Sequence, residues 1–432
     1  MARQARPADQ RVVVTGWGMV TPMGGTVEAT WAGCVEGRSA VREFAHWDSR
    51  GLPCRIGGEV DDAVLPPDDL GLVAPATRPH RLLLAAGRQA AAGADLASVA
   101  RRDRIAVIVG GHAGCPAPSD IERTVRHVDE AGRIDAAGLA AETGYVDRNF
   151  HLRRCDHAPA VLAHDLDARG GVLAIVSACA ASAQAIGEAT RALRDGRADA
   201  VVAGGVDSHV NFAGFIGFVL LGARVKRYPS PEKASRPFDR RRSGFVMSEG
   251  AAVVVLETLA SARARGRRVL GEVLGYGDSA DGFRITDVHP EGEGARLAMT
   301  RAMADAGVTP DEVEYVNAHG TSTPTNDPGE TLAIKRALGE ARARQVPVSS
   351  NKSMLGHTIG AAGAVEAILT WKGLAEGIVL PTINYETPDP KCDLDYVPNT
   401  ARRMPHRVAL SNSFGFGGQN ACLCLGAAPS EG

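Results

Sequence analysis

The sequence has few aromatic residues and almost no net charge, and each shortage excludes a class of protein. Phe, Trp and Tyr make up 5% of the 432 residues, and 48 basic residues nearly balance 50 acidic ones. A net charge of −2 creates no overall field that would attract nucleic acid or an anionic membrane, so neither is expected as a partner. Apolar residues, at 44%, exclude a fully disordered chain, and the length suits one large core or two fused cores.

Cysteine is too scarce and too scattered to build a disulfide scaffold. The chain has eight cysteines, and only Cys422 and Cys424 are close in sequence, where they alternate along an apparent strand. A zinc site needs more ligands than that pair offers, so we expect no bound metal. Free thiols suit a reducing compartment, and the cytoplasm is the expected location. A cysteine with a role should therefore act as a nucleophile.

Long apolar runs are also missing. The stretch from Met1 to Arg11 has no apolar core of the kind that a secretory signal requires. No run approaches the roughly 20 apolar residues of a membrane-spanning helix. We therefore expect neither a signal peptide nor a membrane span.

Glycine, with 50 residues, is abundant, and small residues permit tight turns and close helix packing. Apolar strand patterns alternate with helix patterns, which favours an α/β fold with parallel strand pairing. The expected strands lie near 11–18, 104–109, 172–176, 200–203, 251–256, 268–277, 313–317 and 346–348 and around a turn at 415–418, and the expected helices near 26–36, 81–92, 180–194, 294–306, 328–338 and 360–375. The strand and glycine turn at 268–277 resemble those at 11–18. This echo suggests two related halves around one core, although chance similarity of short apolar strands would also produce it.

A nucleophile candidate lies where the strand at 172–176 meets the next helix. Cys179, in Ser177-Ala178-Cys179-Ala180, would face the unpaired N–H groups at the helix start. Those groups and the helix dipole favour the thiolate, which is the reactive form of cysteine, and they could also hold an oxyanion. The alternative is that Cys179 is a small buried apolar residue, the usual state of a free cysteine.

Two histidines also follow predicted strands. His319 precedes a run of hydroxyl side chains, and His357 precedes a helix start made of small residues. Active sites of open α/β sheets gather at the carboxyl ends of strands, where Cys179 also lies. A single histidine on a loop is more often solvated, but three such groups at equivalent positions favour acyl transfer to carbon through a thioester. Lys352 could tune the local potential, or it could be a surface lysine.

These residues lie in motifs that resemble those of the elongating β-ketoacyl-[acyl carrier protein] synthases of fatty acid and type II polyketide synthesis, members of the thiolase superfamily. The matching stretches are Ser177-Ala178-Cys179-Ala180, Val202-Ala203-Gly204-Gly205, Ser235-Arg236-Pro237-Phe238-Asp239 with Gly244-Phe245, Asn317-Ala318-His319-Gly320-Thr321-Ser322-Thr323-Pro324, Lys352-Ser353-Met354-Leu355-Gly356-His357 and Asn412-Ser413-Phe414-Gly415-Phe416-Gly417-Gly418. The resemblance implies a dimer and the thiolase fold, an α/β architecture of two similar halves stacked as five α/β/α/β/α layers. We expect the halves at residues 1–265 and 266–432.

The resemblance also implies roles for individual residues. Cys179 would receive the acyl chain, and His319 and His357 would support malonyl decarboxylation and stabilise the enolate that forms. Lys352 would act electrostatically. The backbone N–H groups of Cys179 and Phe416 would form an oxyanion hole, and Phe416 would gate the acyl channel. The other implied substrate-binding residues are Thr321 and Thr323 on the phosphopantetheine arm, Glu330 in the polar network of the site, Gly415 and Gly417 beside the gate, and Ala113 at the acyl pocket, where a larger residue in housekeeping synthases limits chain length.

Acyl carrier protein is the implied partner, and because it is acidic, its docking face should be basic. The candidates are Arg78, Arg81, Arg224, Lys226 and Arg227, each of which could instead be an ordinary solvated charge. No tightly bound cofactor is expected, since the phosphopantetheine arm of acyl carrier protein enters with the substrate. The segment 110–165 departs from the family pattern, so the dimer could be a homodimer or a heterodimer with a chain length factor.

The implied reaction is decarboxylative Claisen condensation of malonyl-[acyl carrier protein] with a Cys-bound acyl chain, which adds two carbons in fatty acid or type II polyketide synthesis, polyenes included. Two alternatives stay open. A thiolase-like enzyme would use coenzyme A thioesters and, usually, a second cysteine late in the chain. A catalytically silent chain length partner would lack the nucleophile, whereas Cys179 is present.

Overall fold

The computed structural model describes residues 6–68, 76–111, 118–142, 154–284 and 288–429. Ten strands of these residues form one mixed sheet, in the order β10-β9-β13-β14-β8-β1-β7-β6-β4-β5. The N-terminal strands are β1 (Val12–Val20), β4 (Ile105–Gly110), β5 (Val172–Ile175), β6 (Ala200–Asp207) and β7 (Gly250–Thr258), and the C-terminal strands are β8 (Gly271–Ala280), β9 (Tyr315–Asn317), β10 (Val348–Ser349), β13 (Val408–Gly415) and β14 (Gln419–Gly426).

The two halves of this sheet repeat one internal order. From the junction outward, β1-β7-β6-β4-β5 corresponds to β8-β14-β13-β9-β10, and corresponding neighbours run in the same relative directions. The halves join where β1 pairs antiparallel with β8, with Val12 opposite Val273. The echo of 11–18 at 268–277 is therefore structural, because β1 and β8 occupy equivalent places in the two halves.

The expectation of parallel pairing was wrong for part of each half. β4, β5 and β6 are parallel, as are β9, β10 and β13, whereas β7 and β14 run antiparallel to their neighbours. The link between β13 and β14 is only Phe416–Gly418. So short a link reverses the chain direction, because a parallel connection needs a crossover of a dozen or more residues.

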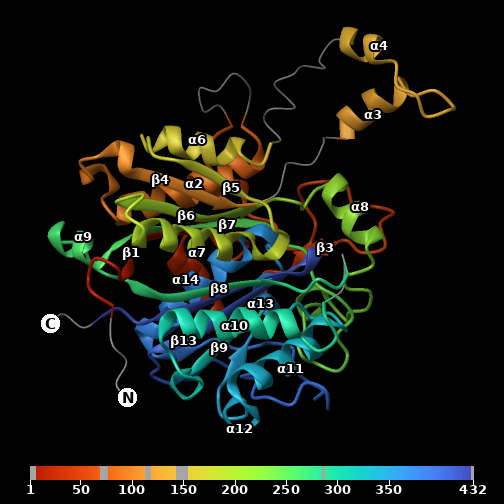
Figure 1. Ribbon diagram of the computed structural model, residues 1–432. Helices are drawn as coiled ribbons and strands as arrows, with labels where there is room; N and C mark the ends of the chain where they lie inside the picture. Colours follow the sequence, from red (N-terminus) through yellow and green to blue (C-terminus); the bar gives the residue numbers. More distant parts are fainter. Residues whose placement is uncertain (1–5, 69–75, 112–117, 143–153, 285–287, 430–432) are drawn as a thin grey trace.

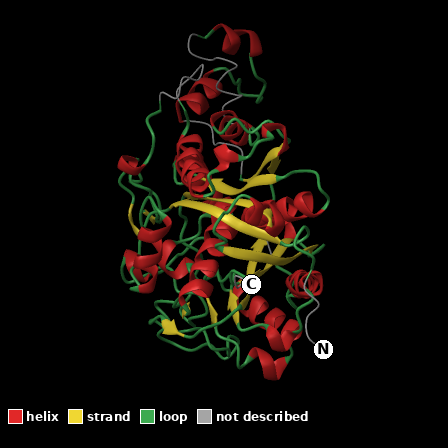
Figure 2. Ribbon diagram, turned by 90° about the vertical axis from the view of Figure 1, so that its left-hand side faces the viewer, coloured by secondary structure: helices red, strands yellow, loops and turns green. Residues whose placement is uncertain are grey.

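The two halves of the sheet lie on either side of a middle layer of helices, and further helices cover their outer faces, which gives five layers (Figure 1). The outer layers are α2 (Arg78–Gly93) with α6 (His157–Asp165) on the N-terminal strands, and α10 (Glu293–Ala306) with α11 (Asn326–Leu338) on the C-terminal strands. The middle layer is α7 (Ala181–Arg194) with α14 (Ala362–Glu376), which pack on strands of both halves. Figure 2 shows the same alternation of helices and strands from the side. The thiolase-type layering expected from the motifs is confirmed.

Small residues let the two middle helices approach closely. A side chain at Gly363, on α14, would lie 2.7 Å from the Cβ of Ala183 on α7. Almost every residue of α14 is buried, as is the α7 face that carries Ala185 and Ala189. The abundance of Gly and Ala therefore has a structural cause, since larger side chains would force the two layers apart.

Shorter elements complete the described fold. They are α1 (Val27–Val35), α3 (Pro118–Arg126), α4 (Ala136–Ala141), α8 (Phe212–Leu220), α9 (Leu259–Ala264), α12 (Glu340–Ala343), α13 (Lys352–Leu355) and the strand pairs β2 (Arg42–Glu43) with β3 (Ile56–Gly57) and β11 (Ile378–Val379) with β12 (Arg402–Arg403). The expected strands and helices are confirmed with small shifts at their ends, but α8 was not expected. In the ranges that the structure describes, no helix combines the length and the apolarity that crossing a bilayer requires.

Candidate active site

Cys179 lies on a tight turn between β5 and α7. The turn is a single 3-10 segment, Ala178–Ala180, in which Ala178 adopts a φ of 50°, a left-handed conformation that is unfavourable for a residue with a side chain. Gly415 packs behind this turn, where a Cβ atom would lie 2.7 Å from the carbonyl oxygen of Ser177 and 3.1 Å from the amide nitrogen of Cys179. The position of the thiol therefore depends on a glycine from the other half of the chain.

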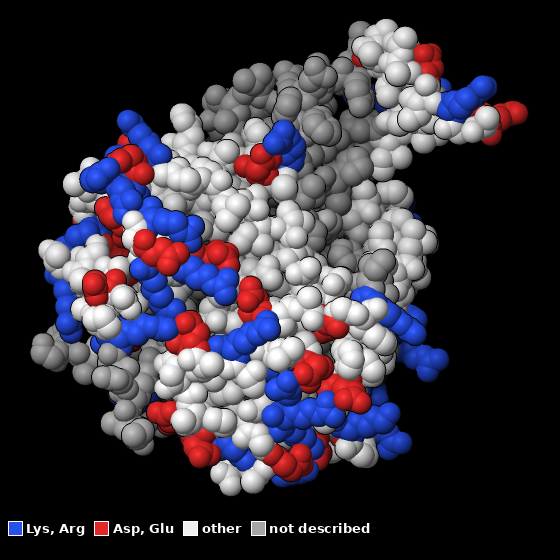
Figure 3. Space-filling model, in the orientation of Figure 1, with Lys and Arg blue, Asp and Glu red and all other residues white. Residues whose placement is uncertain are grey.

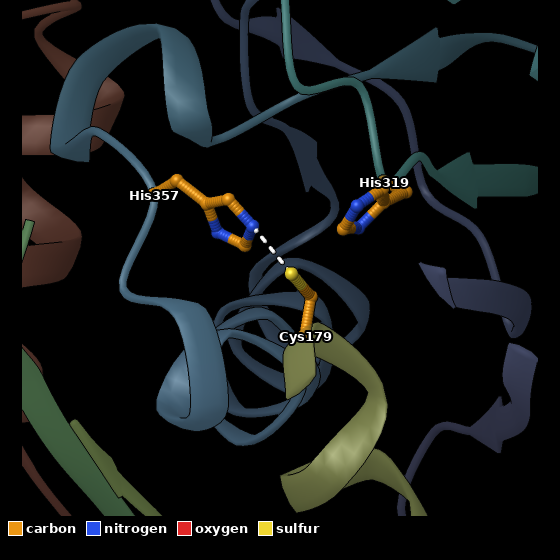
Figure 4. Close-up of side chains that lie close together, drawn as sticks. All are labelled: Cys179, His319 and His357. Carbon is orange, nitrogen blue, oxygen red and sulfur yellow. Dashed lines mark hydrogen bonds between the residues drawn. The ribbon is translucent and has the colours of Figure 1, made fainter. Parts of the chain in front are cut away.

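Two imidazoles converge on the Cys179 thiol (Figure 4). The Nε2 atom of His357 lies 3.0 Å from the Sγ atom of Cys179, and the rings of His319 and His357 are 5.4 Å apart at an angle of 81°. His319 lies just beyond the end of β9, after Ala318, and His357 lies just beyond α13, where its amide donates to the carbonyl of Val246 at 2.7 Å. The structure thus brings together the three residues that the sequence singled out.

The tautomer of His357 follows from its second ring nitrogen. The backbone N–H of Ile359 donates to Nδ1 of His357 at 3.3 Å, so this nitrogen carries no proton. In the neutral ring the proton is then on Nε2, the atom that faces Cys179. His357 therefore presents an N–H donor to the sulfur, and it would present the same donor to a carbonyl oxygen bound beside it.

The helix start was expected to favour the thiolate of Cys179, and in the resting protein burial of the thiol outweighs that effect. Cys179 is fully buried, and burial raises the pKa of its thiol to about 12. Lys352 opposes this rise, as do the backbone N–H groups of Phe416 and of Cys179 itself, but desolvation is the larger effect. The two N–H groups that face the sulfur are those expected to form the oxyanion hole.

Lys352 does not line the cavity, and its charge acts on Cys179 and His319 from outside the cavity wall. Its Nζ atom pairs with a carboxylate oxygen of Glu366, and both side chains are nearly fully buried. Burial raises the pKa of Glu366 to about 7, against the opposing effect of Lys352. Burial, together with the charge of Lys352 and the proximity of His357, holds the pKa of His319 well below its ordinary value. The His319 ring is therefore neutral at physiological pH.

Glu330 positions His319 and does not contact the cavity, which corrects its expected place among the substrate-binding residues. Its carboxylate accepts the backbone N–H groups of His319, at 2.8 Å, and Gly320, at 2.7 Å. The side-chain amide of Asn412 donates to it at 3.1 Å. These bonds fix the backbone at the end of β9, from which the His319 ring extends.

A cavity of about 280 Å³ opens onto Cys179, His319 and His357. Its described wall includes Cys179, His319, His357, Thr321, Thr323, Lys226, Phe245, Gly415 and Phe416. Thr321 and Thr323 lie beside each other, with 3.1 Å between their hydroxyl oxygens. Gly417 is not part of this wall, and Ala113 lies outside the described residues. The cavity is therefore lined by hydroxyls toward the threonines and by aromatic rings around Phe416.

Of the five expected docking cations, one is buried and two are partly exposed beside carboxylates. Arg224 is buried, with 3% of its surface exposed. Arg78 pairs with buried Glu249 at 2.6 Å and also with Asp62, which the Arg81 side chain approaches to 3.5 Å. Lys226 and Arg227 are exposed. On the face drawn in Figure 3, Lys and Arg side chains lie among Asp and Glu side chains over much of the surface.

Cys179, His319 and His357 are also the one described trio with ligand atoms close enough to hold a metal ion, all within 4.8 Å of one another. Zinc ligands surround the ion at about 2.0 to 2.3 Å and are usually four. Here the Sγ atom of Cys179 and the Nε2 atom of His357 are 3.0 Å apart, which is a hydrogen-bonding distance. The arrangement fits a hydrogen-bonded pair better than a metal site.

The sequence analysis gave no role to two residues of this site: Glu366 was not identified, and Phe245 was named only as part of a matching motif. Glu366 supplies the counter-charge to Lys352, and its signal in the sequence is a carboxylate among the otherwise apolar and small residues of the first part of helix α14. Phe245 lines the cavity and packs its ring edge-on against His357, with centroids 5.5 Å apart. A phenylalanine in a long loop carries no local sign of this contact.

Comparison with known proteins agrees with this geometry. Residues 9–262 match the β-ketoacyl synthase N-terminal domain, and residues 270–386 match the C-terminal domain. The chain is 40% identical to 3-oxoacyl-[acyl-carrier-protein] synthase 2 of Synechocystis over 96% of this chain and 98% of that protein. Among solved structures, it is similar to the ketosynthase AntDE in complex with the acyl carrier protein AntF of a type II polyketide synthase (TM-score 0.85, 31% identity, 97% of this chain and 99% of that one). It is also similar to the ishigamide ketosynthase/chain length factor (TM-score 0.82, 33% identity, 97% and 99%). The chain belongs to the β-ketoacyl synthase family of acyltransferases.

Proposed function

We propose that this chain is a ketosynthase that condenses a Cys179-bound acyl group with the malonyl unit of malonyl-[acyl carrier protein]. The observation that carries the proposal is the placement of one buried thiol between two imidazoles, with Nε2 of His357 at 3.0 Å from the sulfur. A hydrolase with a Cys–His pair needs one histidine, whereas a condensing enzyme must both bind an acyl group and stabilise an enolate.

The first half-reaction loads the acyl chain. The sulfur of Cys179 attacks the thioester carbonyl carbon, the bond to the phosphopantetheine sulfur breaks, and that sulfur leaves with a proton. Negative charge on the carbonyl oxygen would be held by the backbone N–H groups of Cys179 and Phe416, which face the sulfur. Because burial favours the neutral thiol, the charge of Lys352 and these N–H groups supply the stabilisation that the thiolate needs.

The second half-reaction makes the carbon–carbon bond. The malonyl carboxylate leaves as carbon dioxide, and the electron pair of the broken bond forms an enolate on the remaining thioester. His319 and His357, both neutral donors in this role, would hydrogen-bond the enolate oxygen. The enolate carbon then attacks the Cys179 thioester, and the carbon–sulfur bond breaks. This step releases a chain longer by two carbons and leaves the Cys179 thiolate, which takes up one proton from solvent to return to the thiol.

Acyl carrier protein delivers both substrates in this proposal, and no other cofactor is needed. Its phosphopantetheine arm would enter along Thr321 and Thr323, which line the cavity. Lys226 lines the same cavity and is exposed, as is neighbouring Arg227, so these two cations would meet the acidic partner. The cytoplasm, a reducing compartment, would suit the seven cysteines of the described residues, none of which is in a disulfide.

A second subunit would cover the edge of the sheet at β5. Val172, Leu173 and Val176 expose 43%, 47% and 55% of their surfaces there, an apolar edge that a single chain would leave open to pairing. A second copy or a chain length factor would fit this edge. Within the chain, we place the boundary between the halves at 265 and 266, in the link between β7 and β8.

Among the residues that the structure describes, the thiolase-like alternative finds no second cysteine at the cavity. Cys422 and Cys424 are fully buried in β14 and do not line the cavity wall. The deciding experiment incubates the purified chain, with any copurifying subunit, with acyl- and malonyl-[acyl carrier protein]. We expect a product two carbons longer and release of carbon dioxide. Condensation with coenzyme A thioesters but none with carrier-bound substrates would favour the alternative.

A further inference from the structure

The turn that follows His357 contains a strained backbone. Ile359 begins the 3-10 turn Ile359–Ala361 with a φ of 42°, a left-handed conformation. This conformation is rare for residues with a side chain and is an outlier for a β-branched one. The Ile359 side chain is fully buried in the apolar cluster that also contains Cys179. Strain of this kind persists only where the surrounding contacts hold the backbone in place.

Two consecutive backbone N–H groups of this turn have acceptors outside it. The N–H of Ile359 donates to Nδ1 of His357 at 3.3 Å, and the N–H of Gly360 donates to Oδ2 of Asp207 at 3.2 Å. The two planar peptide groups that carry these donors meet at the Cα atom of Ile359. A contact that fixes the Gly360 peptide group therefore also restrains the Ile359 N–H that faces the imidazole.

Asp207 is well placed to anchor this turn. It ends β6, and its side chain is fully buried. Its Oδ1 atom accepts the backbone N–H of His209 at 3.1 Å and lies 2.5 Å from Nδ1 of the same residue, while Oδ2 faces the turn. The strand also approaches the turn directly, since a Cβ atom at Gly205 would lie 2.7 Å from the carbonyl oxygen of Gly360. β6 therefore contacts Gly360 at both its N–H and its carbonyl oxygen.

The charge of Asp207 does not by itself assist the nucleophile. Burial is the main cause of the raised pKa of the Cys179 thiol, and the negative charge of Asp207 raises this pKa further. A nearby carboxylate makes a thiolate harder to form. A benefit of Asp207 to the site would therefore come from its hydrogen bond to the turn and not from its charge.

We propose that Asp207 is a positioning residue for His357. Its carboxylate holds the Gly360 N–H and with it the strained backbone at Ile359, whose own N–H keeps Nδ1 of His357 unprotonated. The proton then stays on Nε2, the atom that faces Cys179 and that would donate to the enolate oxygen. The effect on the enolate rests on the proposed condensation, whereas the effect on the tautomer does not.

The first test measures the tautomer of His357 by nitrogen NMR spectroscopy of the full-length protein with isotope-labelled histidine. The chemical shift distinguishes a protonated from an unprotonated ring nitrogen, and His357→Asn assigns the signals. We expect the proton on Nε2 in the wild type and in Asp207→Asn, whose amide oxygen can still accept the Gly360 N–H. Asp207→Leu keeps a branched side chain but has no acceptor, so the tautomer with the proton on Nδ1 should increase at least tenfold.

The second test measures malonyl decarboxylation in the Cys179→Gln protein, in which acyl loading plays no part. Adding Asp207→Leu should lower kcat for carbon dioxide release at least tenfold and leave KM for malonyl-[acyl carrier protein] within twofold. Adding Asp207→Asn should keep kcat within threefold. Glu257→Met is the matched control, because Glu257 is a buried carboxylate at the other end of the β6–β7 pair, opposite Ala200. It should leave the tautomer and kcat unchanged.

The proposal is overturned if the wild-type protein carries the proton on Nδ1 of His357, a result that needs no variant. It is also overturned if folded Asp207→Leu keeps the wild-type tautomer, or if Glu257→Met changes the tautomer equally. If circular dichroism shows that Asp207→Leu does not fold, the same criteria apply to Asp207→Ser, whose hydroxyl ends one atom short of the carboxylate oxygens. If the tautomer changes as expected but the Cys179→Gln protein releases no carbon dioxide, the positioning role stands and the proposed function is contradicted.

Discussion

The Nε2 atom of His357 lies 3.0 Å from the Sγ atom of Cys179, and this contact joins the two halves of the chain at the reaction centre. Cys179 comes from the turn after β5, in the N-terminal half, and His357 from the segment after α13, in the C-terminal half. Neither half alone contains the site, so the close packing of the middle layer positions the chemistry as well as stabilising the fold.

Lys352 and Glu366 form a buried ion pair, and a double variant can distinguish the effect of Lys352 on stability from its effect on acyl loading. Lys352→Met should lower the free energy of unfolding by about 3–5 kcal/mol, because it leaves the Glu366 carboxylate buried without its cation. Lys352→Met combined with Glu366→Gln should recover most of that stability, as measured by denaturant unfolding. Acyl loading of Cys179 should stay slow in both, since Lys352 is the main charge that lowers the pKa of this thiol. Equal loading in the double variant and the wild type would show that Lys352 has only a structural role.

The raised pKa of Glu366 predicts a pH-dependent stability. Its pKa in the folded protein is about 7, above the ordinary value of 4.5, so the folded state binds this proton more tightly than the unfolded state. The stabilisation of the folded state by this proton is complete below pH 4.5 and is lost as the pH rises through about 7. Relative to Glu366→Gln, the wild type should therefore lose up to about 3 kcal/mol of unfolding free energy between pH 5 and pH 9. Parallel stability curves for the two proteins would contradict this assignment.

Two glycines of the Phe416 loop should respond differently to alanine. Gly415→Ala would place a Cβ atom 2.7 Å from the Ser177 carbonyl oxygen and should slow acyl loading at least tenfold by displacing the turn that carries Cys179. Gly417 has a φ of 82° and nothing within 4 Å of the added atom, so Gly417→Ala should cost about 1–2 kcal/mol of backbone strain. Its loading rate should remain closer to wild type. Stopped-flow or quench loading assays on the two variants provide the comparison.

Lys226 and Arg227 should contribute to association with acyl carrier protein rather than to chemistry. Reversing both charges to Glu should raise the KM for carrier-bound substrate several-fold at low salt and leave kcat near its wild-type value. The difference should shrink as ionic strength increases. Arg263→Glu is the matched control, because Arg263 is exposed on α9, at the opposite edge of the molecule in Figure 1. An equal rise in KM for the control would indicate a general charge effect and no local docking.

The sequence was most informative where local chemistry and local geometry coincide. The turn at Cys179 and the strand ends before His319 and His357 identified the three central residues, because runs of small residues and of apolar strand residues can be recognised in the sequence. Burial was not visible in this way. The pKa of Cys179 is raised although it stands at a helix start, and Arg224 is enclosed although it lies in a basic loop.

Long-range pairing was the other limit. Glu366 forms an ion pair with Lys352, although it lies on a helix whose sequence is mostly apolar. The antiparallel directions of β7 and β14 depend on the tertiary packing of the two halves, which the local sequence does not encode. The helix α8 is apolar on all sides and exposes 82% of Leu220, so neither a helical stripe nor strand alternation marked it.

The most direct test of the account is the intact mass of the protein after incubation with acyl-[acyl carrier protein], with the modified peptide then sequenced. The account predicts one acyl group per chain on Cys179, and no mass gain in Cys179→Ala, which should also lose condensation. Cys179→Gln should still release carbon dioxide from malonyl-[acyl carrier protein], since both imidazoles remain. An acyl group on another residue, or condensation that survives in Cys179→Ala, would contradict the central claim.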